Sequence, residues 1–458
     1  MDSSFLGSKD FRWQRLLLFQ YLIGVALNLA FVLVLLGQHS TWKNLQLPEG
    51  EYRDNIWRGS DVMDYVNPAR NFLDFGVFGT GMEPDHYRTI GYPLFLSILM
   101  KVFGKNWLEI AFFAQAFIFA LMYPFLSAMV RLLMIPSKAI INLSFLIWIF
   151  SAAYIATVPV LLTDLFFTVF FTIGLVLGLM SVARQSYLFL AGQLLFLGYS
   201  AQVRPVLFIY PFVHLLVLWS AAKMYGTLST RKTRTIIIVS VALLLVLCNL
   251  MTFRNYIHYR LPEPSNAMSS NLFNSLGYEV LVAKGKLDWF KEMSDRAYSV
   301  PDISERARLM KKYALEIIKR YPLTTLKEMG LHATRILFGS HWLNIGKFWG
   351  YSWRAKQASG RPEAKKSYII LSLTLVWAFI YGVLYFFFGA FLFRLFREKK
   401  YLYLLTLILF MTYFLVPTFI APMGPRMRLP VEGILVFFAL AEMRNMILGT
   451  KYHKRLKI

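Results

Sequence analysis

Ten stretches of this chain are apolar over a length that can cross a lipid bilayer, and this feature limits the possible folds more than any other. A helix needs about 20 predominantly apolar residues to span the hydrocarbon core. Because no water satisfies backbone groups there, such runs form helices. The predicted spans cover residues 16–37, 108–133, 138–157, 162–182, 186–202, 204–222, 235–253, 368–393, 401–420 and 428–447. The expected fold class is therefore an all-α polytopic membrane protein.

The composition supports this class. Hydrophobic residues make up 57% of the chain and charged residues 16%, whereas soluble domains carry about 25% charged residues. The net charge of +24 favours basic loops against anionic lipid over nucleic-acid binding. Membrane lipid is thus an expected partner and nucleic acid is not. Cys248 is the only cysteine, which excludes an intrachain disulfide and a cysteine-based zinc site.

Residues 91–103 decide the topology. This apolar run is short for a span and contains Lys101, so we expect a re-entrant or interfacial helix. The remaining ten spans place both termini on one side, with every short basic loop in the cytoplasm. The first span follows a basic segment and precedes no cleavage site, so we interpret it as an uncleaved anchor.

Two long external segments follow from this topology, at about 38–107 and 254–367. The chain divides accordingly into a membrane domain (1–253) that includes the first external loop, an external, partly helical loop (254–367) and C-terminal transmembrane helices (368–458). Apolar residues at helical spacing predict an amphipathic helix over 302–321, ended by Pro322. Residues 323–338 are predicted to form a second helix at the membrane surface.

The first external loop contains two groups of residues whose side chains are suited to catalysis or ligand binding. Asp61, Asp64 and Tyr65 follow the first span, and Arg88 precedes Gly91-Tyr92-Pro93. A single exposed acid is more often a solvated surface charge than a functional group. Proline in a first turn is equally typical of an ordinary helix start. Each group taken alone therefore predicts no function.

Taken together, the two groups resemble a family. The pattern Asp-x-x-x-Tyr-x-x-x-Ala-Arg-Asn-Phe-Leu, followed by Arg-Thr-x-Gly-Tyr-Pro-Leu-Phe-Leu, is similar to membrane glycosyltransferases with the GT-C fold. It most resembles the bacterial branch related to protein O-mannosyltransferases and the lipid A aminoarabinose transferase. The matching residues are Asp61, Tyr65, Ala69, Arg70, Asn71, Arg88, Thr89, Gly91, Tyr92 and Pro93, with Thr163-Asp164, Arg204-Pro205, Arg254-Asn255-Tyr256 and Arg426-x-Arg428-Leu-Pro430 further on.

The resemblance implies a GT-C-like fold in the bacterial plasma membrane, with both termini cytoplasmic and the first external loop catalytic. The implied donor is a polyprenyl-phosphate-linked sugar, and the acceptor is a glycan, a lipid or a protein. Transfer to a hydroxyl requires a base, for which Asp61 is our first choice. Asp64 and Asp164 are further catalytic candidates, although Asp164 is equally suited to capping a helix with Thr163. A single displacement with one base inverts the anomeric centre.

The phosphate leaving group needs positive charge where its negative charge develops. Arginine suits phosphate oxygens because its planar fork is bidentate and permanently charged. The alternative for each arginine is snorkelling at a helix end. The phosphate-binding candidates are Arg88, Arg204, Arg254, Arg426 and Arg428, and the substrate-positioning candidates are Tyr65, His86 and Tyr92.

Two alternatives stay open. No cofactor is predicted, because the Asp-x-Asp metal signature of the oligosaccharyltransferase branch is absent. The first loop also lacks the adjacent Asp-Glu pair that many relatives show. A divalent metal is nevertheless possible, with oxygen and nitrogen ligands drawn from Glu83, Asp85, His86, His258, His332 and His341. The alternative function is a transporter or flippase of lipid-linked glycans. That function needs ionisable pairs deep within spans, and the sequence shows few of them.

Overall fold

A computed structural model describes residues 11–38, 62–133, 138–149, 151, 154, 158, 161, 163–339, 364–420 and 428–448. Helices account for nearly all the regular structure in these ranges. The described ranges also contain two strands, β1 (Gly79–Thr80) and β2 (Glu83–Pro84), which pair antiparallel in a short hairpin.

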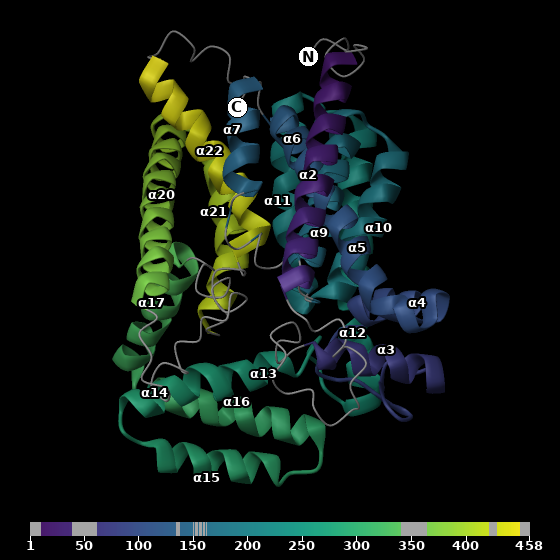
Figure 1. Ribbon diagram of the computed structural model, residues 1–458, viewed down its shortest axis with the longest axis vertical. Helices are drawn as coiled ribbons and strands as arrows, with labels where there is room; N and C mark the ends of the chain where they lie inside the picture. Colours follow the sequence, from purple (N-terminus) through teal and green to yellow (C-terminus); the bar gives the residue numbers. More distant parts are fainter. Residues whose placement is uncertain are drawn as a thin grey trace.

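An upright bundle of apolar helices forms the larger part of the molecule (Figure 1). Its members are α2 (Phe11–Gln38), α5 (Trp107–Ala120), α6 (Met122–Leu133), α7 (Lys138–Ile149), α9 (Thr163–Ala183), α10 (Tyr187–Val203), α11 (Tyr210–Tyr225), α12 (Arg231–Tyr259), α20 (Ala364–Arg397), α21 (Tyr401–Leu415) and α22 (Leu429–Leu448). Within the described ranges, seven helical segments are long and apolar enough to cross a membrane. The prediction of an all-α polytopic membrane protein is confirmed at this level.

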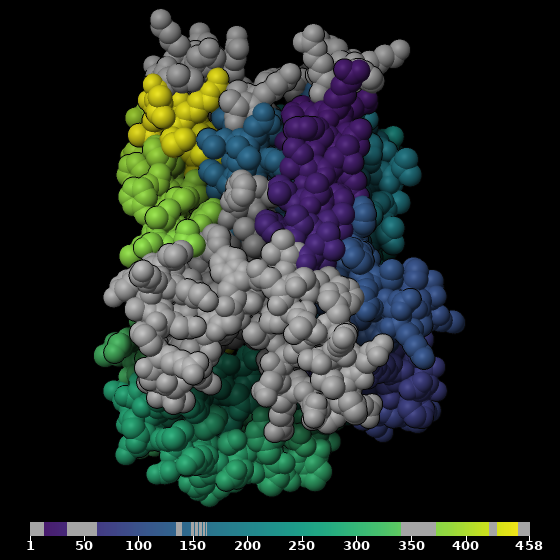
Figure 2. Space-filling model, in the orientation of Figure 1, coloured from purple at the N-terminus to yellow at the C-terminus, as the bar shows by residue number. Residues whose placement is uncertain are grey.

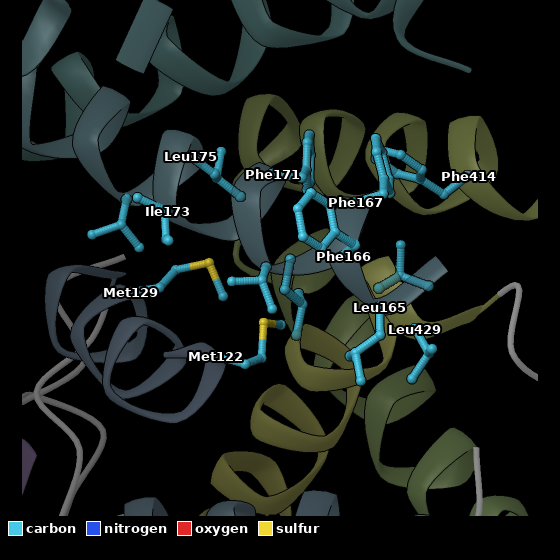
Figure 3. Close-up of a cluster of buried hydrophobic side chains, with 14 of the residues drawn as sticks. Met122, Met129, Leu165, Phe166, Phe167, Phe171, Ile173, Leu175, Phe414 and Leu429 are labelled. Atoms are coloured by element: carbon cyan, nitrogen blue, oxygen red, sulfur yellow. The ribbon is translucent and has the colours of Figure 1, made fainter. Parts of the chain in front are cut away.

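Helix α9 lies at the centre of the bundle. It is apolar on all sides, which is typical of a fully surrounded helix, and 83% of its most apolar stretch is buried. Figure 3 shows Phe167 and Phe171 of α9 beside Phe414 of α21. The close approach of neighbouring helices to α9 also requires small residues at the contact. A Cβ atom at Gly174 would lie 2.7 Å from Leu197 of α10, so only glycine fits there.

A second layer covers one end of the bundle. It consists of α13 (Ala267–Asn271), the π-helix η6 (Leu272–Gly277), α14 (Tyr278–Ala283), α15 (Leu287–Tyr298), α16 (Ile303–Arg320) and α17 (Pro322–Phe338). Figure 2 shows this outer layer as a teal-to-green surface below the bundle. It has its own apolar core, which includes Phe273, Val280 and Ile317. The outer layer therefore corresponds to the predicted partly helical external loop.

The two helices predicted in that loop are present. The side chain of Asp302 accepts a 2.7 Å hydrogen bond from the backbone N–H of Glu305, which caps the start of α16. Pro322 then begins α17, because proline is tolerated in a first turn. Helix α17 packs against α20 and connects the outer layer to the bundle (Figure 1).

Helices α3 (Met63–Phe75) and α4 (Gly91–Phe103) pack against each other at the same end of the bundle. Both project sideways in Figure 1. Helix α4 exposes three large apolar residues, Ile98, Val102 and Phe103, which are 53%, 66% and 44% exposed. An apolar outer face on a short helix beside a membrane bundle is typical of an interfacial helix. Whether residues 91–103 cross the membrane stays a matter for the topology experiment described below.

Candidate functional site

Helix α3 brings Asp64 and Tyr65 to the end of the bundle. Asp64 lies in its first turn, where an acid is favoured by the helix dipole. Tyr65 is only 5% exposed and packs edge-on against Tyr92, with ring centroids 5.4 Å apart. The β1–β2 hairpin then turns the chain back, so that the segment carrying Arg88 returns to the start of α3.

Arg88 and Asp64 form an ion pair. The Nη2 atom of Arg88 lies 2.6 Å from Oδ2 of Asp64, and its Nε donates to the same oxygen at 3.2 Å. The Nη1 atom donates to the Tyr65 hydroxyl at 3.4 Å. The Arg88 side chain is 17% exposed and that of Asp64 is 43% exposed. The predicted phosphate ligand and one predicted acid thus lie in direct contact, within reach of solvent.

Asp164 and Arg204 form a second, more buried ion pair. Asp164 lies in the first turn of α9, and Arg204 directly follows α10. Their Oδ1 and Nη1 atoms are 2.5 Å apart. The Asp164 side chain is 4% exposed and that of Arg204 is 22% exposed. A carboxylate this deeply buried requires a partner, because an isolated buried charge is strongly destabilising.

Tyr65 and Thr163 connect the two ion pairs. Their hydroxyl oxygens are 3.3 Å apart, although the residues are 98 positions apart in the sequence. Burial is the largest influence on Tyr65 and raises the pKa of its hydroxyl, while the nearby charge of Arg88 opposes this increase. We call the six connected residues the acid–arginine cluster: Asp64, Tyr65, Arg88, Thr163, Asp164 and Arg204.

Three other predicted site residues lie around the cluster with contacts of their own. Tyr92 is fully buried and donates a hydrogen bond to Gln115 of α5. The ring of His86 lies 5.5 Å from that of Tyr259, and burial lowers the pKa of its imidazole. Arg254 donates to the backbone carbonyl of Asp85. The substrate-positioning roles of Tyr92 and His86 stay predictions.

Arg428 lies in a separate buried network. Its side chain is 3% exposed, and its Nη1 donates at 2.7 Å to the carbonyl oxygens of both Ile336 and Leu337 at the end of α17. Its Nε donates to Glu432 at 3.3 Å. These contacts join α17 to α22. The structure therefore places Arg428 apart from the acid–arginine cluster, in a position that stabilises helix packing.

Three predicted residues lie outside the described ranges: Asp61, Arg426 and His341. Within those ranges, no group of three or more His, Cys, Asp or Glu residues is placed to hold a metal ion. His332 instead contacts Glu279, with Nε2 and Oε2 2.5 Å apart. Its Nδ1 lies 2.8 Å from the carbonyl oxygen of Phe419. A divalent metal stays an untested prediction.

The Glu279–His332 pair was not predicted from the sequence. The two residues are 53 positions apart, on α14 and α17. Neither lies in a recognisable local pattern, because an acid and a histidine on two amphipathic helices are ordinary surface residues. Only the packing of α17 against α14 brings them together and buries His332 completely.

Comparisons with known proteins give no further assignment. No protein-family model, no curated protein and no solved structure matches this chain. The features of this chain that point to a function are therefore the sequence pattern of the first external loop and the geometry of the acid–arginine cluster.

Proposed function

We propose that this protein is a membrane glycosyltransferase that moves a sugar from a polyprenyl-phosphate donor to an acceptor hydroxyl. The acceptor is a glycan, a lipid or a protein, and transfer takes place at the outer face of the bacterial plasma membrane. The observation that supports this proposal most is the acid–arginine cluster. It gathers carboxylates and guanidinium groups at the end of the bundle, beside helices α3 and α4.

The chemistry of transfer suits such a location. A carboxylate accepts the proton of the acceptor hydroxyl as the new glycosidic bond forms. The bond between the anomeric carbon and the phosphate oxygen breaks, and its electron pair leaves with the phosphate. Asp61 is the proposed base and lies three positions before Asp64 in the sequence. One base is sufficient for inversion, whereas a retaining route requires a second carboxylate about 5 Å away by analogy with glycosidases.

The donor phosphate is proposed to bind between Arg88 and the start of α4. A helix N-terminus offers free backbone N–H groups and partial positive charge to an anion. The start of α4 is held firmly, because a Cβ atom at Gly91 would lie 2.6 Å from the carbonyl oxygen of Gln202. In the structure Arg88 contacts Asp64. Donor binding is therefore proposed to draw the Arg88 guanidinium partly away from Asp64 and onto the phosphate.

Substitutions of Arg88 test this phosphate site. We expect transfer activity to fall in the order Arg, Lys, Ala, because lysine keeps the charge but loses the bidentate fork. Removal of a charged hydrogen bond costs about 1.5–3 kcal/mol, or roughly 10- to 150-fold in donor kcat/KM. Lys101→Ala, on the exposed last turn of α4, is the matched control and should retain parental activity. Parental rate and donor affinity in Arg88→Ala would refute the site, and Arg204 would become the better candidate.

The proposed topology has ten crossings with both termini cytoplasmic. The described helices overlap all ten predicted spans, and the start of α2 and the end of α22 lie at the same end of the bundle in Figure 1. In a variant lacking Cys248, we expect an impermeant thiol reagent to label Ser299→Cys in intact cells. Ser229→Cys should be labelled only after permeabilisation. Labelling of both sites, or reporter fusions that place the two termini on opposite sides, would show a different number of crossings.

A donor screen tests the function itself. Purified protein in proteoliposomes is incubated with a panel of polyprenyl-phosphate sugars, and both released polyprenyl phosphate and translocated donor are measured. The proposal predicts release that depends on an acceptor. Translocation of intact donor without release would instead support the transporter or flippase alternative. The identity of the active donor and acceptor defines the substrate class.

A further inference from the structure

Four successive backbone carbonyls in the turn before Arg88 accept hydrogen bonds from the end of α12 and the segment that follows it. The donor to His86 is a backbone N–H, at 3.0 Å, and the other three donors are side chains. The pairs are Tyr259 with Pro84, Arg254 with Asp85, Asn266 with His86 and Ser265 with Tyr87. We call residues 84–87 the carbonyl turn. The three side-chain donors lie 169 to 178 positions further along the sequence than the carbonyls they bind.

Further hydrogen bonds also fix this segment. The Oδ1 atom of Asp85 accepts from the backbone N–H groups of Tyr87 at 2.7 Å and Arg88 at 3.1 Å. The hydroxyl of Thr89 donates to the carbonyl of Val203 at 2.7 Å, which ties the chain to the end of α10. The backbone that carries Arg88 is thus held both by α10 and by the end of α12 with the segment that follows it.

This arrangement differs from an ordinary surface turn. Carbonyls in an exposed turn commonly bond to water, which imposes no direction on the chain. Here, protein donors replace water at four consecutive positions, and three of these donors are side chains. The ring of one of them, Tyr259, also packs against His86. Groups that must be held within fractions of an ångström are usually supported by such surrounding hydrogen bonds. The residue supported in this way is Arg88, which contacts both Asp64 and Tyr65.

We infer that Arg254, Tyr259 and Ser265 are positioning residues that fix the location of Arg88 through the carbonyl turn. The inference gives Arg254 a role other than the phosphate contact predicted from the sequence. Its consequence for catalysis rests on the proposed function. Its structural part, the coupling of the second external segment to the Arg88 backbone, does not depend on that function.

The test uses Tyr259→Phe and Ser265→Ala, each of which removes one hydroxyl donor with little change in shape. Tyr256→Phe is the matched control, because Tyr256 lies on the same helix and is 51% exposed. Hydrogen–deuterium exchange is measured on peptides that cover residues 84–90 in the full-length protein. Loss of one hydrogen bond should speed exchange there by roughly two- to tenfold, and exchange in α9 should not change.

Turnover provides the second readout. Each variant should lower kcat by roughly three- to tenfold when Arg88 is present, because small misplacements of a reacting group reduce rate steeply. In an Arg88→Ala background, the same substitutions should cause no further loss. A structural role alone would reduce activity equally in both backgrounds.

The outcomes are distinguishable. Unchanged exchange at residues 84–90 in both variants would overturn the inference, whatever the activity. Faster exchange with equal losses of kcat in the parental and Arg88→Ala backgrounds would also overturn it. If the parent protein shows no turnover with any donor, the proposed function fails by itself, and the exchange result alone decides whether these residues hold the carbonyl turn. A variant that does not fold is replaced by the other single variant.

Discussion

The Asp61→Asn variant is expected to fold normally and to lose donor turnover by about 10²–10⁴-fold, the usual contribution of a general base. Asparagine keeps the size of the side chain but does not accept the acceptor's proton. Initial rates of polyprenyl-phosphate release measure the effect. Asp74→Asn is the control, because Asp74 is an exposed acid on α3 in the same external loop. It should release polyprenyl phosphate at the parental rate.

Near-parental turnover by well-folded Asp61→Asn protein would show that another group accepts the proton. Asp64→Asn is then the next variant to measure. Because Asp64 is also the partner of Arg88, its substitution changes two functions at once. A loss confined to kcat would indicate a catalytic base, whereas a change in donor KM would indicate a disturbed Arg88.

Arg204→Ala is expected to cause the largest loss of stability. It removes the guanidinium that lies 2.5 Å from the Asp164 carboxylate, a side chain that is only 4% exposed. Removing one member of a buried ion pair typically costs about 3–5 kcal/mol, because the remaining charge stays desolvated. A clear fall in the thermal unfolding midpoint of detergent-purified protein would show this. Lys223→Ala, an exposed change at the end of α11, should leave the midpoint unchanged.

The double variant Asp164→Asn/Arg204→Gln separates charge from packing. Asparagine matches aspartate in size and glutamine keeps the first part of the arginine side chain, so the desolvated charge is absent and most of the lost stability should return. An Arg204→Ala protein that unfolds at the parental temperature would show that the pair contributes little. No recovery in the double variant would show that the loss comes from packing of the guanidinium instead.

The helices could be predicted because their signals are local. Apolar runs of sufficient length fix the bundle helices through backbone hydrogen bonding in lipid. The periodicity of α16 and its boundary residues, Asp302 and Pro322, are likewise contained within one short stretch of sequence. The predicted span 108–133 is divided at Leu121 into α5 and α6, and this break also has a local cause. Pro124 lies in the first turn of α6 and has no N–H to donate to the carbonyl of Ala120.

The partners of charged residues could not be predicted because they depend on tertiary packing. Arg88 and Asp64 are 24 positions apart, and Arg204 and Asp164 are 40 positions apart. Each arginine has the same local environment in the sequence, namely a charged residue beside an apolar helix, which also suits snorkelling. Arg428 shows the difference. It was predicted as a phosphate candidate on the same sequence pattern as the others, yet its side chain is buried and donates to carbonyls of α17.

Release of polyprenyl phosphate in lipid nanodiscs tests the central claim most directly. A nanodisc has no separate compartments, so transport does not contribute to the signal and only cleavage of the sugar–phosphate bond is detected. With the correct donor and acceptor, the parent protein should release polyprenyl phosphate in many turnovers, and Asp61→Asn and Arg88→Ala should each reduce the rate by at least tenfold. Absence of release by folded parent protein across all classes of polyprenyl-phosphate sugar, or release at the parental rate by both variants, would contradict a glycosyltransferase site at the acid–arginine cluster.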